Sequence, residues 1–238
     1  MTLLVGLRGA DGLVVATDSR GTFGDPRGIT AQNDAQRKLY VTSKYTAVMT
    51  AGAGELGATV MKEILDKMTG VEGVTPVMQL VRQVALERYR EWFPNFSIQP
   101  VQGQPQRPDL ALMVAGYDVD AADHVAEPRM FQLLSQMDFA PMLHNYGFAL
   151  CGVAQYALYL LNRLYQPDSS IEQLKALAAY VITETASQDG KVGGPVQMAM
   201  ITAGGCKELA TDQVREIIKH NDGRSEQLKK SFFKGGGS

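Results

Sequence analysis

The sequence predicts an α+β protein, a four-layer αββα sandwich in which two antiparallel sheets are flanked by pairs of helices. Strand-like and helix-like patterns come in blocks rather than in βαβ alternation, which favours antiparallel sheets. A chain of 238 residues is long enough to bury one sizeable core. No repeat or low-complexity run divides it. We therefore expect a single domain over residues 1–220 and a polar, partly disordered tail over residues 221–238.

The first fifty residues are typical of strands. Short apolar and β-branched runs predict strands at residues 3–8, 13–17, 38–42 and 45–50. The polar segment 21–36 contains Gly and Pro and is expected to be a loop. The sequence Ala-Gly-Ala-Gly at 51–54 ends the strand pattern.

Two helix pairs alternate with the remaining strands. Apolar residues at helical spacing predict helices at about residues 56–68, 75–92, 153–165, 170–186 and 211–220. Strands are expected at residues 109–117, 129–134, 147–150, 196–203 and 208–210.

The composition excludes several classes of protein. A net charge of −2 lacks the basic surplus of a nucleic-acid binder. No apolar run approaches the ~20 residues of a membrane span, and the N-terminus lacks the cationic region of a signal peptide. Two cysteines are too few for a disulfide framework or a zinc site. We expect a cytoplasmic protein with no metal, no cofactor and no nucleic-acid or membrane partner.

Several segments, in order, carry a family resemblance. They are Thr-Leu-Leu-Val-Gly at 2–6, Asp-Gly-Leu-Val-Val-Ala-Thr-Asp-Ser-Arg at 11–20, Lys-Leu-Tyr-Val at 38–41, Thr-Ala-Gly-Ala at 50–53, Phe-Ala-Leu-Cys-Gly at 148–152 and Asp-Gly-Lys-Val-Gly-Gly at 189–194. Over residues 2–205 the chain resembles proteasome β-type subunits and HslV-like bacterial homologues, which are N-terminal-nucleophile (Ntn) hydrolases. The resemblance implies the Ntn-hydrolase fold.

The resemblance makes Thr2 the nucleophile. A threonine hydroxyl attacks poorly until a base removes its proton. If Met1 is removed, the free α-amine of Thr2, with a pKa of ~7.7–8.0, supplies that base. No propeptide precedes Thr2 here, so autocleavage is not expected to be needed. The alternative is a threonine that merely follows a start methionine.

The resemblance assigns charged roles to Asp18 and Lys38, and makes Arg20 a structural pairing partner. A carboxylate at the end of an apolar strand needs a nearby cation, and a lysine beside Thr2 would lower the pKa of the nucleophile and its amine. The interval from Asp18 to Lys38 is longer than the family's, and Arg37 competes for the lysine position. The alternative is that Asp18 begins a turn and Lys38 is a solvated strand end.

Gly52 is the expected oxyanion donor, through its backbone N–H, and such a donor contributes ~2.7–4 kcal/mol in the transition state. An ordinary turn glycine is the alternative. The resemblance also implies a substrate pocket for apolar or neutral side chains, lined by Gly21, Thr22, Gln36, Tyr40, Thr50 and Gly54.

Two family turns depart from the pattern near the expected nucleophile. The family has a serine in each turn that hydrogen-bonds the amine, whereas this chain has Gly152 and Val192 at those positions. The second turn keeps Asp189, which the resemblance makes catalytic. Water, Cys151 or Asp189 alone would then serve the amine.

These assignments predict a threonine-type endopeptidase that cleaves peptides or unfolded proteins through an acyl-enzyme on Thr2. Two alternatives stay open: a peptide ligase or transpeptidase that uses the same Thr2, and a catalytically silent ring subunit. The resemblance further implies a homo-oligomeric ring or stacked rings, with a possible ATP-driven unfoldase as partner.

Overall fold

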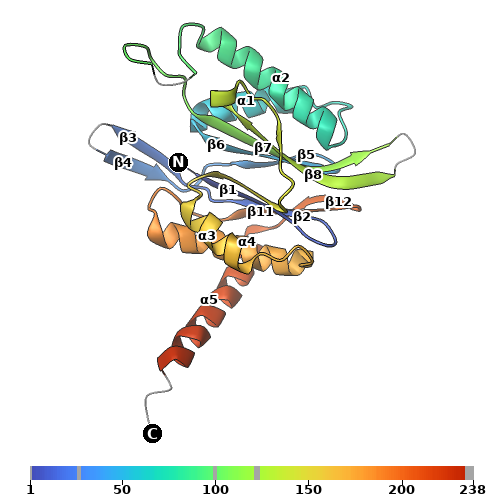
Figure 1. Ribbon diagram of the computed structural model, residues 1–238, viewed down its shortest axis with the longest axis vertical. Coiled ribbons are helices and arrows are strands. Elements are labelled where there is room, and N and C mark those ends of the chain that lie inside the picture. Colours follow the sequence, from blue (N-terminus) through green and yellow to red (C-terminus); the bar gives the residue numbers. More distant parts are fainter. Residues whose placement is uncertain (1, 26–27, 99–100, 121–123, 234–238) are drawn as a thin grey trace.

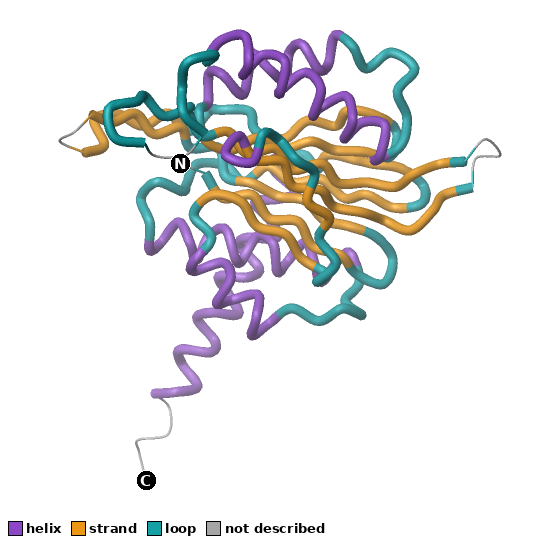
Figure 2. The backbone as a smooth tube through the Cα atoms, turned by 45° about the horizontal axis from the view of Figure 1, so that its top comes forward, coloured by secondary structure: helices purple, strands orange, loops and turns teal. Residues whose placement is uncertain are grey.

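Two five-stranded antiparallel sheets lie face to face, and helices cover the outer face of each (Figures 1 and 2). The computed structural model describes residues 2–25, 28–98, 101–120 and 124–233. The four layers confirm the αββα sandwich expected from the block order of strands and helices.

The first sheet has the strand order β10-β1-β2-β11-β12. These strands are β10 (Phe148–Gly152), β1 (Leu3–Arg8), β2 (Leu13–Thr17), β11 (Gln197–Thr202) and β12 (Gly205–Glu208). Helices α3 (Gln155–Leu164) and α4 (Ile171–Gln188) cover its outer face. β2 is buried along its whole length because helices cover one of its faces and the second sheet covers the other.

The second sheet has the order β5-β6-β7-β8-β9. Its strands are β5 (Leu39–Ser43), β6 (Thr46–Gly52), β7 (Leu110–Val119), β8 (Val125–Leu134) and β9 (Met142–Leu143). Helices α1 (Gly54–Asp66) and α2 (Val74–Trp92) cover it, and a 3₁₀ turn, η1 (Ser135–Met137), follows β8. A core between the sheets, which includes Leu4, Val15, Met49 and Met113, joins the two halves.

The expected loop over residues 21–36 instead contains a hairpin. Strands β3 (Gly21–Asp25) and β4 (Gly28–Asn33) form a separate two-stranded sheet that projects beside the N-terminus (Figure 1). The expectation was wrong because a ribbon that projects from the body needs no buried face. Its sequence therefore lacks the apolar alternation that identifies a half-buried strand.

Helix α5 (Thr211–Phe233) also exceeds its expected end. The segment after residue 220 was expected to be a polar tail, but the helix continues to Phe233 and extends away from the body (Figure 1). The rest of that expected tail, residues 234–238, lies outside the described residues. The buried Asn221 anchors it, donating from Nδ2 to the carbonyl of Ala176 on α4 at 2.8 Å. Beyond that point Glu226 and Lys229, which are one helical turn apart, form an ion pair. Between residues 221 and 233 the large apolar residues are Leu228, Phe232 and Phe233, too few for the helical spacing that predicts a helix from sequence.

No helix in the described ranges combines the length and the apolar character that crossing a membrane requires.

Candidate active site

Thr2 directly precedes β1 and lines a pocket. The carbonyl of Thr2 accepts a hydrogen bond from the Val153 N–H at 2.9 Å, and the residue is 3% exposed. Gly152, opposite Leu3 in the β1–β10 register, has φ +87°. A Cβ added at Gly152 would lie 1.7 Å from the Thr2 carbonyl oxygen. The backbone of Thr2 therefore packs directly on a position that only glycine can occupy.

Asp18 is fully buried just after β2, and both of its carboxylate oxygens accept two hydrogen bonds. Oδ1 accepts from the Leu3 N–H at 3.0 Å and from Lys38 Nζ at 3.1 Å. Oδ2 accepts from the N–H groups of Arg20 and Gly193, each at 3.1 Å. Four donors, of which Lys38 is the one cation, make a buried carboxylate tolerable, since an unpaired one would be costly.

Lys38 lies against Asp18 rather than in solvent. Its side chain is 2% exposed, and Nζ also donates to the Arg20 carbonyl at 2.6 Å. Burial lowers the pKa of Lys38 below its usual range, although the neighbouring Asp18 carboxylate opposes that shift. The side chain of Arg37 is 60% exposed and pairs with Glu208. The residue that faces Asp18 is therefore Lys38, and it is not a solvated strand end.

Arg20 pairs with a residue that the sequence analysis did not single out. Its guanidinium binds Asp34 through two contacts, Nε to Oδ1 at 2.7 Å and Nη2 to Oδ2 at 2.8 Å. Nη1 donates to the Gly190 carbonyl at 3.2 Å. The hydrogen bond to Asp34 raises the pKa of Arg20 and lowers the pKa of Asp34. The backbone of Arg20 hydrogen-bonds to Asp18 and Lys38, whereas its side chain ties the base of the hairpin to the turn at 189–194.

Gly52 ends β6 with φ +101°, a conformation that favours glycine. A Cβ added there would lie 2.1 Å from the Asp109 carbonyl oxygen. The next N–H, that of Ala53, donates to this same carbonyl at 2.7 Å. Gly52 is exposed and lines the pocket together with Thr2.

The pocket has a volume of about 410 Å³ and lies between the start of β3, the start of α1 and Thr2. Its lining comprises Thr2, Arg20, Gly21, Thr22, Phe23, Gln36, Gly52, Ala53, Gly54, Glu55, Leu56 and Pro108. Four of the six residues expected from the sequence are among them: Gly21, Thr22, Gln36 and Gly54. Sequence reasoning missed Phe23, Glu55 and Leu56, because the hairpin and the exact start of α1 were not predicted.

The other two expected pocket residues, Tyr40 and Thr50, do not belong to this lining as the described residues form it. Tyr40 packs against the core beneath α1 and α2, and its hydroxyl donates to the Arg37 carbonyl at 3.2 Å. Thr50 is buried next to Gly57 of α1. Both lie on the helix-covered face of their sheet, whereas the pocket opens at its edge.

The amide of Gln36 fills the space that two pocket glycines leave. A Cβ added at Gly54 would lie 2.1 Å from Gln36 Nε2, and one added at Gly21 would lie 2.9 Å from Oε1. Because Gly21 and Gly54 have no side chain, the Gln36 amide has room between them.

Asp189 follows α4 and holds the turn that leads to Gly193. Its Oδ1 accepts the Lys191 N–H at 2.9 Å, and its carbonyl accepts the Val192 N–H at 3.0 Å. Val192 is fully buried in the apolar core beneath α3 and α4. The contacts of Asp189 thus support the turn that supplies the Gly193 N–H to Asp18.

The two cysteines lie outside this chemistry. Burial raises the pKa of Cys151 and of Cys206 to about 12, so both thiols are protonated at neutral pH. Within the described ranges, no group of three or more His, Cys, Asp or Glu side chains is arranged to hold a metal ion.

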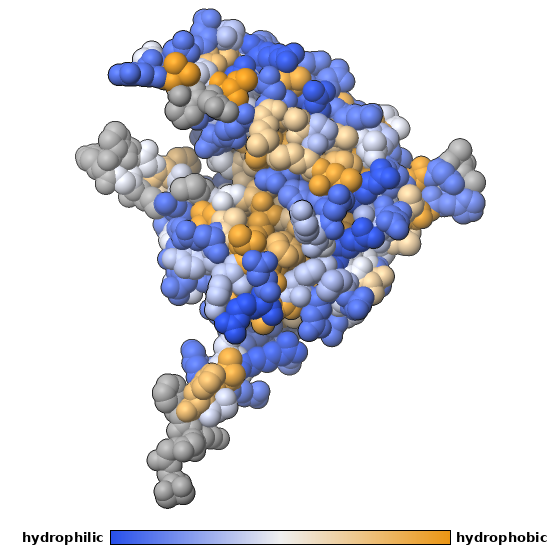
Figure 3. Space-filling model, viewed as in Figure 1, coloured by the Kyte–Doolittle hydropathy of each residue, from blue (hydrophilic) through white to orange (hydrophobic). Residues whose placement is uncertain are grey.

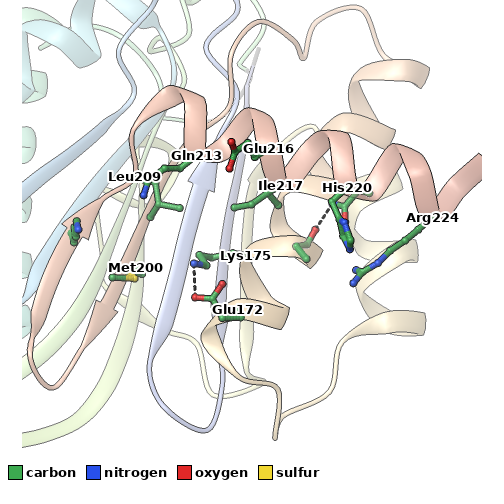
Figure 4. A pocket seen from close by; sticks show the side chains of 12 residues that line it. Glu172, Lys175, Met200, Leu209, Gln213, Glu216, Ile217, His220 and Arg224 are labelled. Carbon is green, nitrogen blue, oxygen red and sulfur yellow. Dashed lines mark hydrogen bonds and ion pairs between the residues drawn. The ribbon is translucent and has the colours of Figure 1, made fainter.

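A second pocket, of about 440 Å³, lies between α4, α5 and the strands β11 and β12 (Figure 4). Lys175 forms an ion pair with Glu172 at 2.6 Å within it, and His220 and Arg224 reach it from α5. None of the residues expected to be catalytic lines this pocket.

The chain has the αββα sandwich of the Ntn-hydrolase fold, and in it the buried Asp18–Lys38 pair lies beside Thr2, the residue that precedes β1. The chain belongs to the proteasome family: the family model described as proteasome subunit matches residues 2–201. The proteasome subunit beta of Methanocaldococcus vulcanius is 26% identical over 236 residues, covering 97% of this chain and 94% of that protein. The proteasome subunit beta of Gordonia bronchialis is 24% identical, covering 92% and 74%.

Solved structures of similar fold include Anbu (ancestral beta-subunit) from Yersinia bercovieri. It has a TM-score of 0.74 and 16% sequence identity, over 99% of each chain. The helical assembly of the Anbu complex from Pseudomonas aeruginosa has a TM-score of 0.70 and 20% identity, over 96% of each chain. At these identities the likeness concerns the fold.

Proposed function

We propose that this protein is a threonine-type peptidase that cleaves peptide bonds through an acyl-enzyme on Thr2, exposed when Met1 is removed. One observation carries the proposal. The Asp18 oxygen that binds Lys38 also binds the Leu3 N–H, which fixes a buried cation beside the backbone of the nucleophile. Thr2 and Gly52 line one pocket, which supports a nucleophile and a backbone donor that act on the same carbonyl.

Each step of the proposed reaction has a group to perform it. The α-amine of Thr2 takes the proton from Oγ as Oγ attacks the peptide carbonyl. The positive charge of Lys38 lowers the pKa of both Thr2 groups, and the Gly52 N–H stabilises the oxyanion. The protonated amine then gives its proton to the leaving amine. A water molecule, deprotonated by the same α-amine, hydrolyses the ester and restores the hydroxyl.

The proposed substrates are peptides or unfolded chains, and the pocket of about 410 Å³ beside Thr2 supports side chains of modest size. Asp189 acts in this proposal by holding the turn at 189–194, and water takes the place of the family serines around the amine. An ATP-driven unfoldase would deliver folded substrates to this peptidase. The proposed compartment is the cytoplasm, where thiols such as those of Cys151 and Cys206 stay reduced.

Self-assembly into a homo-oligomer belongs to the same proposal. Membership of the proteasome family supports it, as does the fold shared with an Anbu chain whose structure is titled a helical assembly. Large apolar residues are exposed on two helices, Tyr156, Leu158, Tyr159 and Leu164 on α3 and Leu228 and Phe232 on α5. Figure 3 shows apolar residues gathered across the middle of one face and others on the projecting α5. Light scattering on the purified protein measures the mass of the particle in solution, which distinguishes a monomer from a ring or a helical assembly.

A silent structural subunit is the second candidate. It is favoured by the absence of hydroxyl groups at Gly152 and Val192, where the family has serines. Fluorogenic peptide hydrolysis separates the two functions. A peptidase keeps activity in Thr2→Ser and loses it in Thr2→Ala, whereas a structural subunit shows no hydrolysis that depends on Thr2. Added amine nucleophiles that divert the acyl group to a new amide would indicate ligation instead.

A further inference from the structure

Gln197 is the first residue of β11, in the first sheet. Its side chain reaches the segment 36–39, which leads into β5 of the second sheet. Its side-chain oxygen Oε1 accepts the N–H groups of Lys38 at 2.9 Å and Leu39 at 3.1 Å. Its Nε2 donates to the Gln36 carbonyl at 2.7 Å. One amide therefore satisfies three backbone groups of the segment that leads into β5.

The position of Gln197 connects the two partners of the buried ion pair. In the β2–β11 register Gln197 lies opposite Thr17, the residue before Asp18. Asp18 thus follows a strand that pairs with β11, whereas Lys38 precedes a strand of the other sheet. The side chain of Gln197 therefore joins β11, the neighbour of β2, to the backbone of Lys38.

The chemistry of an amide suits this task. The segment presents two N–H donors and one carbonyl acceptor, and a glutamine side chain offers both an acceptor and a donor. The opposite side of the segment is held by β6, since the Thr50 N–H donates to the Lys38 carbonyl at 2.9 Å. Without Gln197, this segment would lose three hydrogen bonds on the side that faces the first sheet.

We infer that Gln197 is a positioning residue that sets where Lys38 and Gln36 stand relative to Thr2. The inference rests on the proposed peptidase function. Lys38 Nζ reaches both Asp18 Oδ1 and the Arg20 carbonyl, so a backbone shift at Lys38 weakens two short contacts together. Misplacing a catalytic group by about 1 Å can cost about a hundredfold in rate.

The test uses Gln197→Met, which keeps the length of the side chain and removes its hydrogen bonds. We expect kcat for a fluorogenic peptide to fall about tenfold to a hundredfold. The acid limb of the pH–rate profile moves to higher pH, because a displaced Lys38 depresses the pKa of the Thr2 amine less. The charged groups that act on Lys38 are Asp18, Arg20 and Asp34, and the substitution leaves all three in place.

Gln132→Met is the matched control. Gln132 is also a half-buried strand glutamine. Its Nε2 donates to the Leu150 carbonyl across the sheets at 3.5 Å, and its Oε1 lies 2.9 Å from His144 Nε2. We expect its rate and pH profile to match those of the unsubstituted protein.

Three outcomes would overturn the inference. Unchanged kcat and acid limb in Gln197→Met, in a protein whose hydrolysis depends on Thr2, would refute the role of Gln197 alone. Equal losses in both glutamine variants would mean that general stability sets the rate. Hydrolysis that is equally absent from the unsubstituted protein and Thr2→Ala would refute the proposed function, and the inference with it.

Discussion

Asp18 and Lys38 meet across the two sheets in a buried ion pair, with 3.1 Å between Oδ1 and Nζ. The same carboxylate oxygen accepts the N–H of Leu3, so the pair is tied to the residue that follows Thr2. Neither charge is exposed to water, so each depends on the other.

Removing the cation should therefore affect both activity and stability. We expect Lys38→Ala to abolish peptide hydrolysis and to lower the free energy of unfolding by about 3–5 kcal/mol, because it leaves a buried carboxylate unpaired. Denaturant unfolding measures the loss of stability. The double variant Asp18→Asn, Lys38→Met should recover part of the stability and none of the activity.

Arg37→Ala is the matched control for that experiment, since the side chain of Arg37 is largely exposed. It should change stability by less than about 0.5 kcal/mol and leave hydrolysis intact. A larger effect on hydrolysis from Arg37→Ala than from Lys38→Ala would contradict the assignment of the lysine.

Restoring a serine at position 152 should inactivate the protein rather than improve it. The Gly152 conformation has positive φ, and a Cβ there meets the Thr2 carbonyl oxygen. We expect Gly152→Ser to displace Thr2 and to abolish both hydrolysis and reaction with a threonine-directed electrophile. Faster hydrolysis in Gly152→Ser would show that the turn can rearrange, against this account of Gly152.

Thiol reagents should not inactivate the protein. Burial holds the pKa of Cys151 at about 12, so the thiolate that would react is scarce at neutral pH. Incubation with iodoacetamide should leave hydrolysis unchanged and Cys151 unmodified by peptide mapping. Loss of activity that Cys151→Ala prevents would instead give the cysteine a catalytic part.

The contact between α1 and α2 should weaken on acidification. Arg88 and Lys67 hold the pKa of Glu63 at about 2, below its ordinary 4.5. A carboxyl with a depressed folded pKa stabilises the protein above its unfolded pKa, and this contribution fades as pH falls through the folded value. The melting temperature of Glu63→Gln should therefore lie below that of the unsubstituted protein at pH 7. The gap should close toward pH 2, and a gap that stays constant with pH would argue against the assignment.

Burial decides how much of this fold the sequence predicts. Strands β1 and β2 are covered on both faces, and their continuous apolar runs identify them. The hairpin of β3 and β4 and the end of α5 project from the body, so too few apolar residues mark them in the sequence. The site divides in the same way. Asp18 is conspicuous as a charge after a buried strand, whereas Asp34 and Gln197 reach their partners only through the register of the folded sheets.

We propose that Thr2 becomes an activated N-terminal nucleophile once Met1 is removed. The most direct test of this proposal is the intact mass of the purified protein before and after treatment with a peptide epoxyketone. We expect a chain that begins at Thr2 and gains one adduct, with no adduct in Thr2→Ala. A mass that keeps Met1 and gains no adduct would contradict it, and would leave Asp18 and Lys38 as a structural ion pair.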